Sequence, residues 1–261
     1  YINYDIQAWS VDNAAMETYR DGTPIPKVTN PGEWISLTTG AWCYYLNDSS
    51  KGKLYNWYAV AGIHDNNPNT PNKEFSPEGW HVATDAEWTI LKEFMIDNGY
   101  NFDGTNTGNK IAKAMASTSG WQSSNAQGAP GFNQSINNIS CFNSFPNGYR
   151  SQSDGTFVNQ PPSEVYWTST LNSNNYQAST MELFNNHIDL DLRYNSYHDG
   201  GYSVRFVQDS ENHCSAPTGS LTQAFCNTAT VLDLTAIGEN IQWYDADTGG
   251  NLLDSSTVLS D

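Results

Sequence analysis

The sequence predicts an α+β fold followed by a smaller all-β unit, and three observations lead to this prediction. Two helices are indicated, and they are embedded among many short strands and long loops, which favours α+β over a parallel α/β sheet. Aromatic residues make up 13% of the 261 residues and supply bulk for a loop-rich core. The composition then changes at residues 209–212, so the predicted domains are residues 1–209 and residues 210–261.

Residues 76–88, SPEGWHVATDAEW, predict a short buried strand followed by the start of the first helix. Thr84 can cap the helix, and Glu87, three residues later, can bond back to the amide of the cap residue. The helix then shows one apolar face at helical spacing, formed by Trp88, Leu91, Phe94 and Met95. His81 is expected to be a core or second-layer residue.

The other elements are predicted in chain order from turn residues and short apolar runs. Before the first helix we expect a turn at residues 21–26, aromatic strand or core segments at 42–45 and 54–60, and a polar surface loop at 64–75. After it we expect a short second helix around 109–116, a hairpin of residues 141–150 and 154–157, and strands at 165–170, 178–183, 188–194 and 202–207. In the second unit we expect strands at 231–234 and 241–244. About 50 residues are too few for an ordinary β-sandwich, so this unit either continues beyond Asp261, the option that we favour, or leans on a neighbour.

The charge of the chain excludes several classes of function. The formal net charge is −17 and the chain has only 11 Lys and Arg residues, which argues against a nucleic-acid or anionic-membrane partner. The sequence has no apolar run of the length needed to span a bilayer. An acidic chain rich in Asn, Ser, Thr, Gly and Tyr is typical of a secreted protein. The chain starts at Tyr1 without a signal peptide, so we expect a processed or partial chain.

Four cysteines fit export without proving it. Cys43 and Cys141 lie far apart in the first domain, and a disulfide between them would close a long loop and contribute about 4 kcal/mol. The alternative is two buried free thiols. Cys214 and Cys226 lie close together near the end of the chain.

Nine segments carry a resemblance to a known family. They are DGTPIP (21–26), WCYYLNDSS (42–50), GKLYNWYAV (52–60), PEGWHVATDAEW (77–88), GYNFDGTNTGNKIAKAMAS (99–117), FPNGYR (145–150), DGTF (154–157), YWTST (166–170) and GYSVRFVQD (201–209). Through them, residues 7–209 resemble the Fibrobacter succinogenes major paralogous domain family. The resemblance implies a fold like that of C-type lectins and sulfatase-modifying factors, in secreted or cell-surface modules of bacteria.

The second unit carries a separate resemblance. APTGS (216–220), FC (225–226) and IQWYDADTGG (241–250) resemble the Ig-like repeats of large surface proteins from gliding and type IX-secreting bacteria. In such repeats the cysteine that matches Cys226 would pair with one further along the chain. A Cys214–Cys226 bridge is the local alternative, and the pairing of Cys226 stays open.

One polar stretch supplies the candidate ligand-binding residues. Four polar side chains alternate with aliphatic ones and would share one face of a strand: His187, Asp189, Asp191 and Arg193. Such a face is either solvated, or a binding surface, or a weak cation site that uses Asp189 and Asp191. Tyr194, Tyr197 and His198 follow in a predicted loop, and Trp167 precedes them. Tyr and Asn on loops carried by a rigid scaffold suit sugar or protein contacts.

The sequence patterns that would indicate a metal site or a catalytic site are weaker than the pattern of the candidate ligand-binding residues. Residues 101–110 hint at a calcium-binding loop, but Gly99 and Lys110 stand where the essential carboxylates belong, so a tight loop with side chains bonded to the backbone is expected. No cofactor is expected, and calcium is the low-ranked alternative. The cysteine pair of formylglycine-generating enzymes has no counterpart at residues 193–207, and the sugar-binding motifs of calcium-dependent lectins are missing. Paired carboxylates for glycoside hydrolysis stay open, because their spacing is spatial.

Together these observations predict a secreted or cell-surface binding module of a bacterial surface protein, without catalysis. Its partner would be an extracellular glycan or a surface protein, reached through the loops after Trp167. The alternative is a structural subunit of an adhesin, a filament or a secretion-related surface complex. A degenerate relative of the sulfatase-modifying enzymes ranks third.

Overall fold

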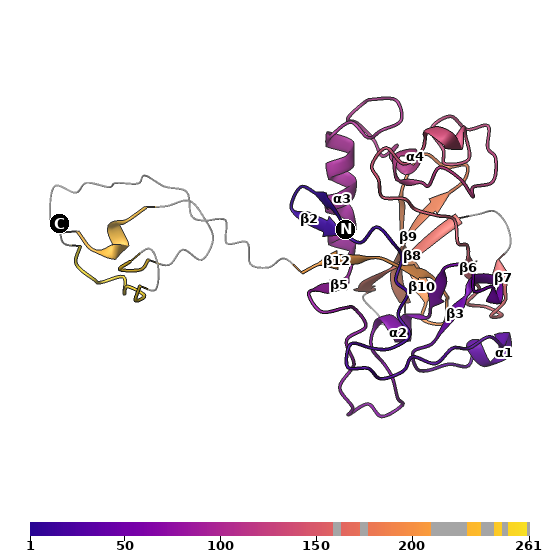
Figure 1. Ribbon diagram of the computed structural model, residues 1–261, viewed down its shortest axis with the longest axis horizontal. Helices are drawn as coiled ribbons and strands as arrows, with labels where there is room; N and C mark the ends of the chain where they lie inside the picture. The colour runs from indigo at the N-terminus through magenta and orange to yellow at the C-terminus, as the bar shows by residue number, and fades with distance from the viewer. Residues whose placement is uncertain (159–162, 173–176, 210–228, 236–242, 247–249, 260–261) are drawn as a thin grey trace. The chain divides into compact units, whose positions relative to one another are not determined.

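The computed structural model describes residues 1–158, 163–172, 177–209, 229–235, 243–246 and 250–259, without the side chains of residues 194 and 195. The chain divides into two compact units, Tyr1–Asp209 and Ser210–Asp261, at the boundary where the composition changes. In the first unit a few helices lie among many short strands, so this unit is α+β (Figure 1). No helix in the described part of the chain is long and apolar enough to cross a lipid bilayer.

The elements of the first unit are short. Its strands are β1 (Ile2–Tyr4), β2 (Gln7–Trp9), β3 (Trp42–Tyr44), β4 (Lys53–Tyr55), β5 (Trp80–Val82), β6 (Tyr149–Arg150), β7 (Phe157–Val158), β8 (Ser163–Leu171), β9 (Gln177–Phe184), β10 (Asp191–Tyr197), β11 (Ser203–Val204) and β12 (Phe206–Gln208). Its helices are α1 (Pro31–Trp34), α2 (Trp57–Val60), α3 (Asp85–Asp97) and α4 (Ala112–Met115), with 3-10 turns at Tyr45–Asn47 and Gln134–Ile136.

Two four-stranded sheets organise these elements. The terminal sheet has the order β1-β2-β12-β5, and the large sheet has the order β10-β9-β8-β11. Two hairpins, β3-β4 and β6-β7, complete the set. In the terminal sheet Val207 pairs with Trp9 and Phe206 pairs with Val82, so both ends of the first unit are fixed in the same sheet.

The Trp88 side chain of helix α3 contacts both sheets. The ring of Trp88 lies 4.6 Å from Trp9 of the terminal sheet and 5.3 Å from Tyr166 of the large sheet, measured between ring centroids. All three side chains are fully buried. The Trp9–Trp88 contact is edge-to-face, and such aromatic pairs add to the free energy gained by burial. One of the buried apolar clusters of this unit therefore forms where the two sheets meet α3.

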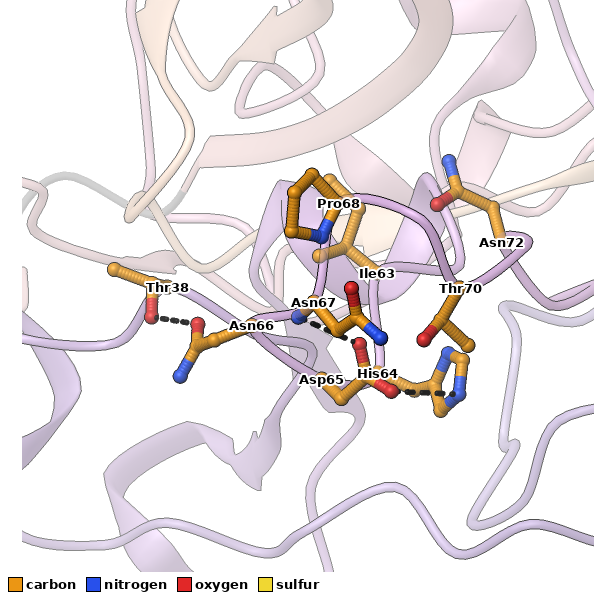
Figure 2. A pocket seen from close by; sticks show the side chains of 9 residues that line it. All are labelled: Thr38, Ile63, His64, Asp65, Asn66, Asn67, Pro68, Thr70 and Asn72. Carbon is orange, nitrogen blue, oxygen red and sulfur yellow. Dashed lines mark hydrogen bonds and ion pairs between the residues drawn. The ribbon is translucent and has the colours of Figure 1, made fainter.

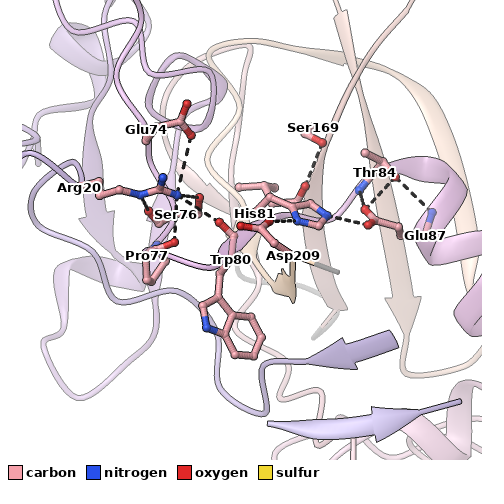
Figure 3. Close-up of polar contacts among 11 residues, drawn as sticks. Arg20, Glu74, Ser76, Pro77, Trp80, His81, Thr84, Glu87, Ser169 and Asp209 are labelled. Carbon is pink, nitrogen blue, oxygen red and sulfur yellow. Dashed lines mark hydrogen bonds and ion pairs between the residues drawn. The ribbon is translucent and has the colours of Figure 1, made fainter. Parts of the chain in front are cut away.

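The start of α3 has the predicted capping box. The Thr84 hydroxyl accepts a hydrogen bond from the Glu87 amide at 3.2 Å, and the Glu87 carboxylate accepts one from the Thr84 amide at 2.8 Å (Figure 3). Trp88, Leu91 and Met95 are buried along one face of the helix, as its spacing predicts. Local sequence signals alone place this helix correctly.

His81 joins three elements beside this cap (Figure 3). Its Nε2 lies 2.6 Å from the Glu87 carboxylate, and its Nδ1 lies 2.6 Å from the carboxylate of Asp209, which directly follows β12. The hydrogen bond to Glu87, helped by the one to Asp209 and opposed by burial, raises the pKa of His81 to about 9. The side chain is 36% exposed, so His81 is a second-layer residue and not a core one.

Arg20 organises the segment that leads into β5. Its guanidinium donates to the carbonyl of Ser76 at 3.0 Å, to the carbonyl of Pro77 at 3.0 Å and to the carbonyl of Trp80 at 3.3 Å (Figure 3). One cation thus satisfies two carbonyl groups of the segment before β5 and the carbonyl of the first residue of β5. This contact explains why residues 76–79 approach β5 in a fixed conformation.

Residues 54–60 form a buried core segment, as one of the two predicted alternatives has it, but they are not one continuous strand. Strand β4 ends at Tyr55, and α2 begins at Trp57. The side chain of Asn56 caps this helix by accepting a hydrogen bond from the Ala59 amide at 3.0 Å. An Asn cap ends the extended conformation inside a segment that is otherwise apolar and aromatic. The second predicted helix, around 109–116, is present but limited to α4.

In the second unit the strand predicted at residues 231–234 is wrong. Val231–Asp233 forms a 3-10 turn, because the Asp233 carboxylate accepts a hydrogen bond from the Thr230 amide at 2.8 Å and closes a capping box. Two isolated bridges, Thr230 with Val258 and Tyr244 with Leu252, are the β pairings in the described part of this unit. Residues 241 and 242 of the other predicted strand lie outside the described residues.

The predicted Cys43–Cys141 disulfide is also wrong. Cys43 is a buried free cysteine in β3, packed with Trp34 and Leu54 in a small core of its own. Cys141 is an exposed free cysteine with a φ of 62°, in a turn closed by a hydrogen bond from its amide to the carbonyl of Asn138. The alternative of two buried thiols is correct for Cys43 alone. Burial raises the pKa of the Cys43 thiol to about 11. Cys214 and Cys226 lie outside the described residues.

Candidate functional site

A hollow of about 340 Å³ lies beside the large sheet and the β6-β7 hairpin, and we call it the sheet hollow. It is lined by Tyr149, Ser151, Gln152, Ser153, Val158, Val165, Glu182, Phe184, Ser196 and Tyr202. Its walls therefore combine aromatic rings with hydroxyl, amide and carboxylate groups. Small-molecule sites typically have this volume and this mixture of apolar walls with a few polar groups.

Strand register explains why these side chains share one face. In β9, Glu182 faces Val165 of β8 on one side and Asp191 of β10 on the other. Side chains alternate along a strand, so Glu182 and Phe184 point to the same side, whereas Met181 and Leu183 point into the main core. One face of the large sheet thus supplies the floor of the hollow.

Two tyrosines form the aromatic part of the wall. The rings of Tyr149 and Tyr202 lie 5.8 Å apart, and Tyr202 also packs on Trp167 at 4.5 Å. The backbone of Tyr202 exchanges two hydrogen bonds with Tyr55, at 3.0 and 2.9 Å. Burial raises the pKa of Tyr202, so its phenol stays protonated. Both rings are therefore fixed in place by strand pairing and packing.

One acidic side chain lines the sheet hollow. The carboxylate of Glu182 accepts a hydrogen bond from Nε of Arg193 at 2.8 Å, and the same guanidinium lies 3.1 Å from the carboxylate of Asp191. The Thr180 hydroxyl lies 3.3 Å from the second oxygen of Glu182. Burial raises the pKa of Glu182, although Arg193 opposes this effect. The three charged groups form a compact cluster at the boundary between β9 and β10.

The loop between β6 and β7 closes one side of the hollow. The side-chain oxygen of Gln152 accepts a hydrogen bond from the Tyr197 amide at 2.8 Å, which ties this loop to the end of β10. Within the loop, Asp154 accepts a hydrogen bond from the Thr156 amide at 3.1 Å. The predicted hairpin is confirmed in its paired part, because Tyr149 pairs with Val158.

The sequence-predicted site residues fall into two groups. Asp191, Arg193 and Tyr197 lie on β10 and meet the sheet hollow or its closing loop. The side chain of Tyr194 lies outside the described residues. The expectation for Trp167 is corrected, because this residue is fully buried and its indole donates to the carbonyl of Tyr55 at 2.8 Å. Trp167 supports the hollow from beneath and cannot contact a ligand at the surface.

His198 lies beneath the surface rather than in an open binding loop. Its ring stacks on Trp57 with centroids 4.5 Å apart and meets the edge of Tyr58 at 5.5 Å. Its Nε2 is buried and has no hydrogen-bond partner among the residues that the structure describes. Burial lowers the pKa of His198, so the ring is neutral at physiological pH. These contacts assign it a packing role.

The strand predicted over residues 188–194 begins later than expected, at Asp191. His187 precedes β10 and packs on Phe184 at 4.9 Å, and Asp189 is partly buried in the same connection. The predicted face of four alternating polar side chains is therefore wrong for its first half. Asp191 pairs with Arg193, and the described residues contain no group of three or more His, Cys, Asp or Glu side chains that could hold a metal ion.

The loop at residues 101–110 has the predicted tight conformation. The Asn101 amide group donates to the carbonyls of Thr105 and Gly108 at 2.8 and 3.0 Å. The ammonium of Lys110 lies 2.5 Å from the Asp103 carboxylate and lowers its pKa to about 2. A lysine side chain thus neutralises the acidic residue of this loop.

A second hollow, of about 280 Å³, lies in the predicted surface loop, and we call it the loop hollow (Figure 2). Its polar side chains bond mostly to one another: the Thr38 hydroxyl donates to Asn66 at 2.6 Å, and His64 lies 3.6 Å from Asp65. Most of its lining comes from one irregular segment, residues 63–72. The sheet hollow is held by paired strands and is the stronger candidate, because rigid elements position side chains better than loops do.

Sequence reasoning missed Tyr149, Glu182 and Tyr202 as site residues. One local signal was available for Glu182, an acid inside the otherwise uncharged strand segment 178–184. Acidic side chains are rarely buried unless they are paired, so this position indicates a partner or a site. The two tyrosines carry no such signal, because the sequence holds fifteen.

Comparison with known proteins identifies the first unit. The model of the Fibrobacter succinogenes major domain family matches residues 2–208, which is almost the whole first unit and well over half of the chain. No curated protein and no solved structure shows a significant match. The chain therefore belongs to the Fibrobacter succinogenes major domain family.

Proposed function

We propose that this chain is a secreted or cell-surface binding module of a bacterial surface protein, and that it binds a saccharide in the sheet hollow without catalysis. The observation that carries the proposal is the wall of the hollow, where Tyr149 and Tyr202 stand beside hydroxyl and amide side chains. Aromatic rings offer apolar surface to the C–H groups of a sugar ring. The polar side chains would bond to its hydroxyl groups and fix its orientation.

The rigidity of the wall supports the same proposal. Tyr202 is anchored by backbone pairing with Tyr55 and by its packing on Trp167. Gln152 is anchored by the amide of Tyr197. Side chains that are ordered before binding lose little conformational entropy when a ligand arrives. Such a site suits saccharides, whose individual contacts are weak.

The proposal extends to the fold of each unit and to the route of export. Residues 1–209 would have a C-type lectin-like fold, and residues 210–261 would be an Ig-like unit of an adhesin-type protein exported by type IX secretion. The resemblance of the two segments and the acidic, aromatic composition support these assignments. Two hypotheses compete with this proposal: the chain binds a protein partner, or it is a structural subunit of a surface complex.

A glycan array probed with the whole chain, with and without a chelator, tests the proposal. We expect specific saccharides to be retained, with no effect of the chelator. The Tyr149→Ala variant should lose at least about tenfold in affinity, which corresponds to about 1.4 kcal/mol. Tyr100→Ala is the matched control, because Tyr100 is also half-buried but lies outside the sheet hollow.

Three results would overturn the proposal. One is an array on which the folded chain retains no saccharide, which would shift support to the protein-partner or structural readings. Another is unchanged retention by Tyr149→Ala. The third is binding that the chelator abolishes, which would revive a cation site at Asp189 and Asp191 in place of the sheet hollow.

A further inference from the structure

The charges at the sheet hollow are unbalanced. Glu182 is the charged residue that lines it, and its side chain is only 13% exposed. Arg193 is the cation within reach, and it is shared between Glu182 at 2.8 Å and Asp191 at 3.1 Å. Two carboxylates and one guanidinium leave the cluster with a formal charge of −1. A ligand in the hollow therefore meets an excess of negative charge.

The geometry directs this excess toward the hollow. Arg193 contacts one oxygen of Glu182, and among the described residues the other oxygen has only the Thr180 hydroxyl at 3.3 Å. Arg193 bridges the two carboxylates, is 46% exposed and lies 5.6 Å from the ring of Phe184, but it does not itself line the hollow. The Glu182 side chain is only 13% exposed, so its carboxylate is poorly solvated, and this burial raises its pKa. A cation brought by a ligand would compensate for that lost solvation.

An acidic sugar would have the opposite effect. Its carboxylate would lie against Glu182 and would compete with two protein carboxylates for Arg193. The net charge of −17 also disfavours the approach of anions and favours the approach of cations. The charge of the ligand can therefore be predicted from the site.

We infer that the sheet hollow takes an amino sugar, with its protonated amino group against Glu182 and its ring against Tyr149 and Tyr202. This inference rests on the proposed saccharide site and adds the ligand class. N-acetylation keeps the sugar ring but removes the positive charge, so the acetylated sugar is the matched neutral ligand. A uronic acid is the matched anionic ligand.

Titration calorimetry at low salt, below the pKa of the amine, tests the inference with three probes. These are the tetramers of glucosamine, of N-acetylglucosamine and of galacturonic acid, added to the whole chain. We expect the glucosamine tetramer to bind at least about tenfold more tightly than the acetylated one, and the uronic acid tetramer to bind most weakly. Added salt should reduce the preference for glucosamine.

Two charge-removing variants locate the effect. Glu182→Gln should reduce the glucosamine preference to about threefold or less, whereas Asp191→Asn removes the same charge outside the lining and should keep most of it. Equal loss in both variants would indicate general electrostatics and would overturn the inference. Circular dichroism shows whether Glu182→Gln folds, and the comparison of the three tetramers on the unmodified chain needs no variant.

The outcomes separate this inference from the proposed function. If the acetylated or the uronic acid tetramer binds as tightly as glucosamine, and Tyr149→Ala abolishes that binding, the saccharide site stands and the amino-sugar inference fails. The same holds if array-retained sugars bind while none of the three tetramers does. If no saccharide binds at all, both fail.

Discussion

Replacing His81 with glutamine should remove a stabilising contact whose strength depends on pH. The imidazole lies 2.6 Å from both Glu87 and Asp209, and these hydrogen bonds raise its pKa from 6.5 to about 9. Because the pKa in the folded state lies above that in the unfolded state, the stabilisation is complete below pH 6.5. It is lost progressively as the pH rises to about 9.

The size of the effect follows from the two pKa values. A difference of about 2.5 between them corresponds to about 3 kcal/mol, at ~1.4 kcal/mol for each tenfold change in proton affinity. The His81 side chain is 36% exposed, so solvent screening weakens its interaction with both carboxylates. We therefore expect His81→Gln to lower the free energy of unfolding by about 1–2 kcal/mol in acidic solution.

Urea denaturation followed by tryptophan fluorescence measures this effect in the original chain and in His81→Gln. The difference between the two proteins should be largest near pH 6 and should approach zero near pH 10. Glu164 also titrates in this range, because burial raises its pKa to about 7, but both proteins contain it and its effect cancels. A difference that is the same at both pH values, or absent near pH 6, would refute the reasoning.

Three further predictions concern the fold. Thr84→Ala should lower the free energy of unfolding by about 1 kcal/mol, because the α3 cap is lost. Thr84→Ser retains the capping hydroxyl and should keep most of the stability in the same urea denaturation. Iodoacetamide should modify Cys141 in the native chain and Cys43 only after denaturation, as followed by mass spectrometry; protection of both thiols would contradict their free state. Trp167→Ala should destabilise the chain by about 3–5 kcal/mol, because its ring is fully buried and its indole bonds to Tyr55; a change below about 1 kcal/mol would exclude a core role.

The elements that the sequence predicts well are those with local causes. Helix α3 has its cap at Thr84, its reciprocal acid at Glu87 and its apolar face within one short segment. Each signal acts over a few residues, and all of them agree. The tight loop at residues 101–110 is predictable for the same reason, because its hydrogen bonds lie within the loop.

The start of β10 depends on a distant contact and was not predictable. Asn109 bonds both the carbonyl and the amide of Leu190, at 2.7 and 3.2 Å, and so holds the residues before Asp191 outside the sheet. Alternating polar and apolar residues continue across this point, so periodicity alone extends the strand too far. The free state of Cys43 and Cys141 was not predictable for the same reason, because separate parts of the fold set the positions of the two residues.

The sheet hollow is the least predictable feature. It brings together Tyr149 of the β6-β7 hairpin, Glu182 of β9 and Tyr202, which directly precedes β11. Their proximity is a consequence of strand order and register, and neither is encoded by spacing along the chain. The sequence identified the right region through Asp191 and Arg193, but it could not show which neighbours complete the site.

Amide chemical-shift mapping tests the central claim most directly. The ¹⁵N-labelled chain would be titrated with the saccharide that the array retains best. We predict that the largest shifts occur at Ser151, Gln152 and Ser196 of the sheet hollow. Shifts confined to residues 63–72 of the loop hollow would contradict the account, and so would a saturating titration that leaves the sheet hollow unperturbed.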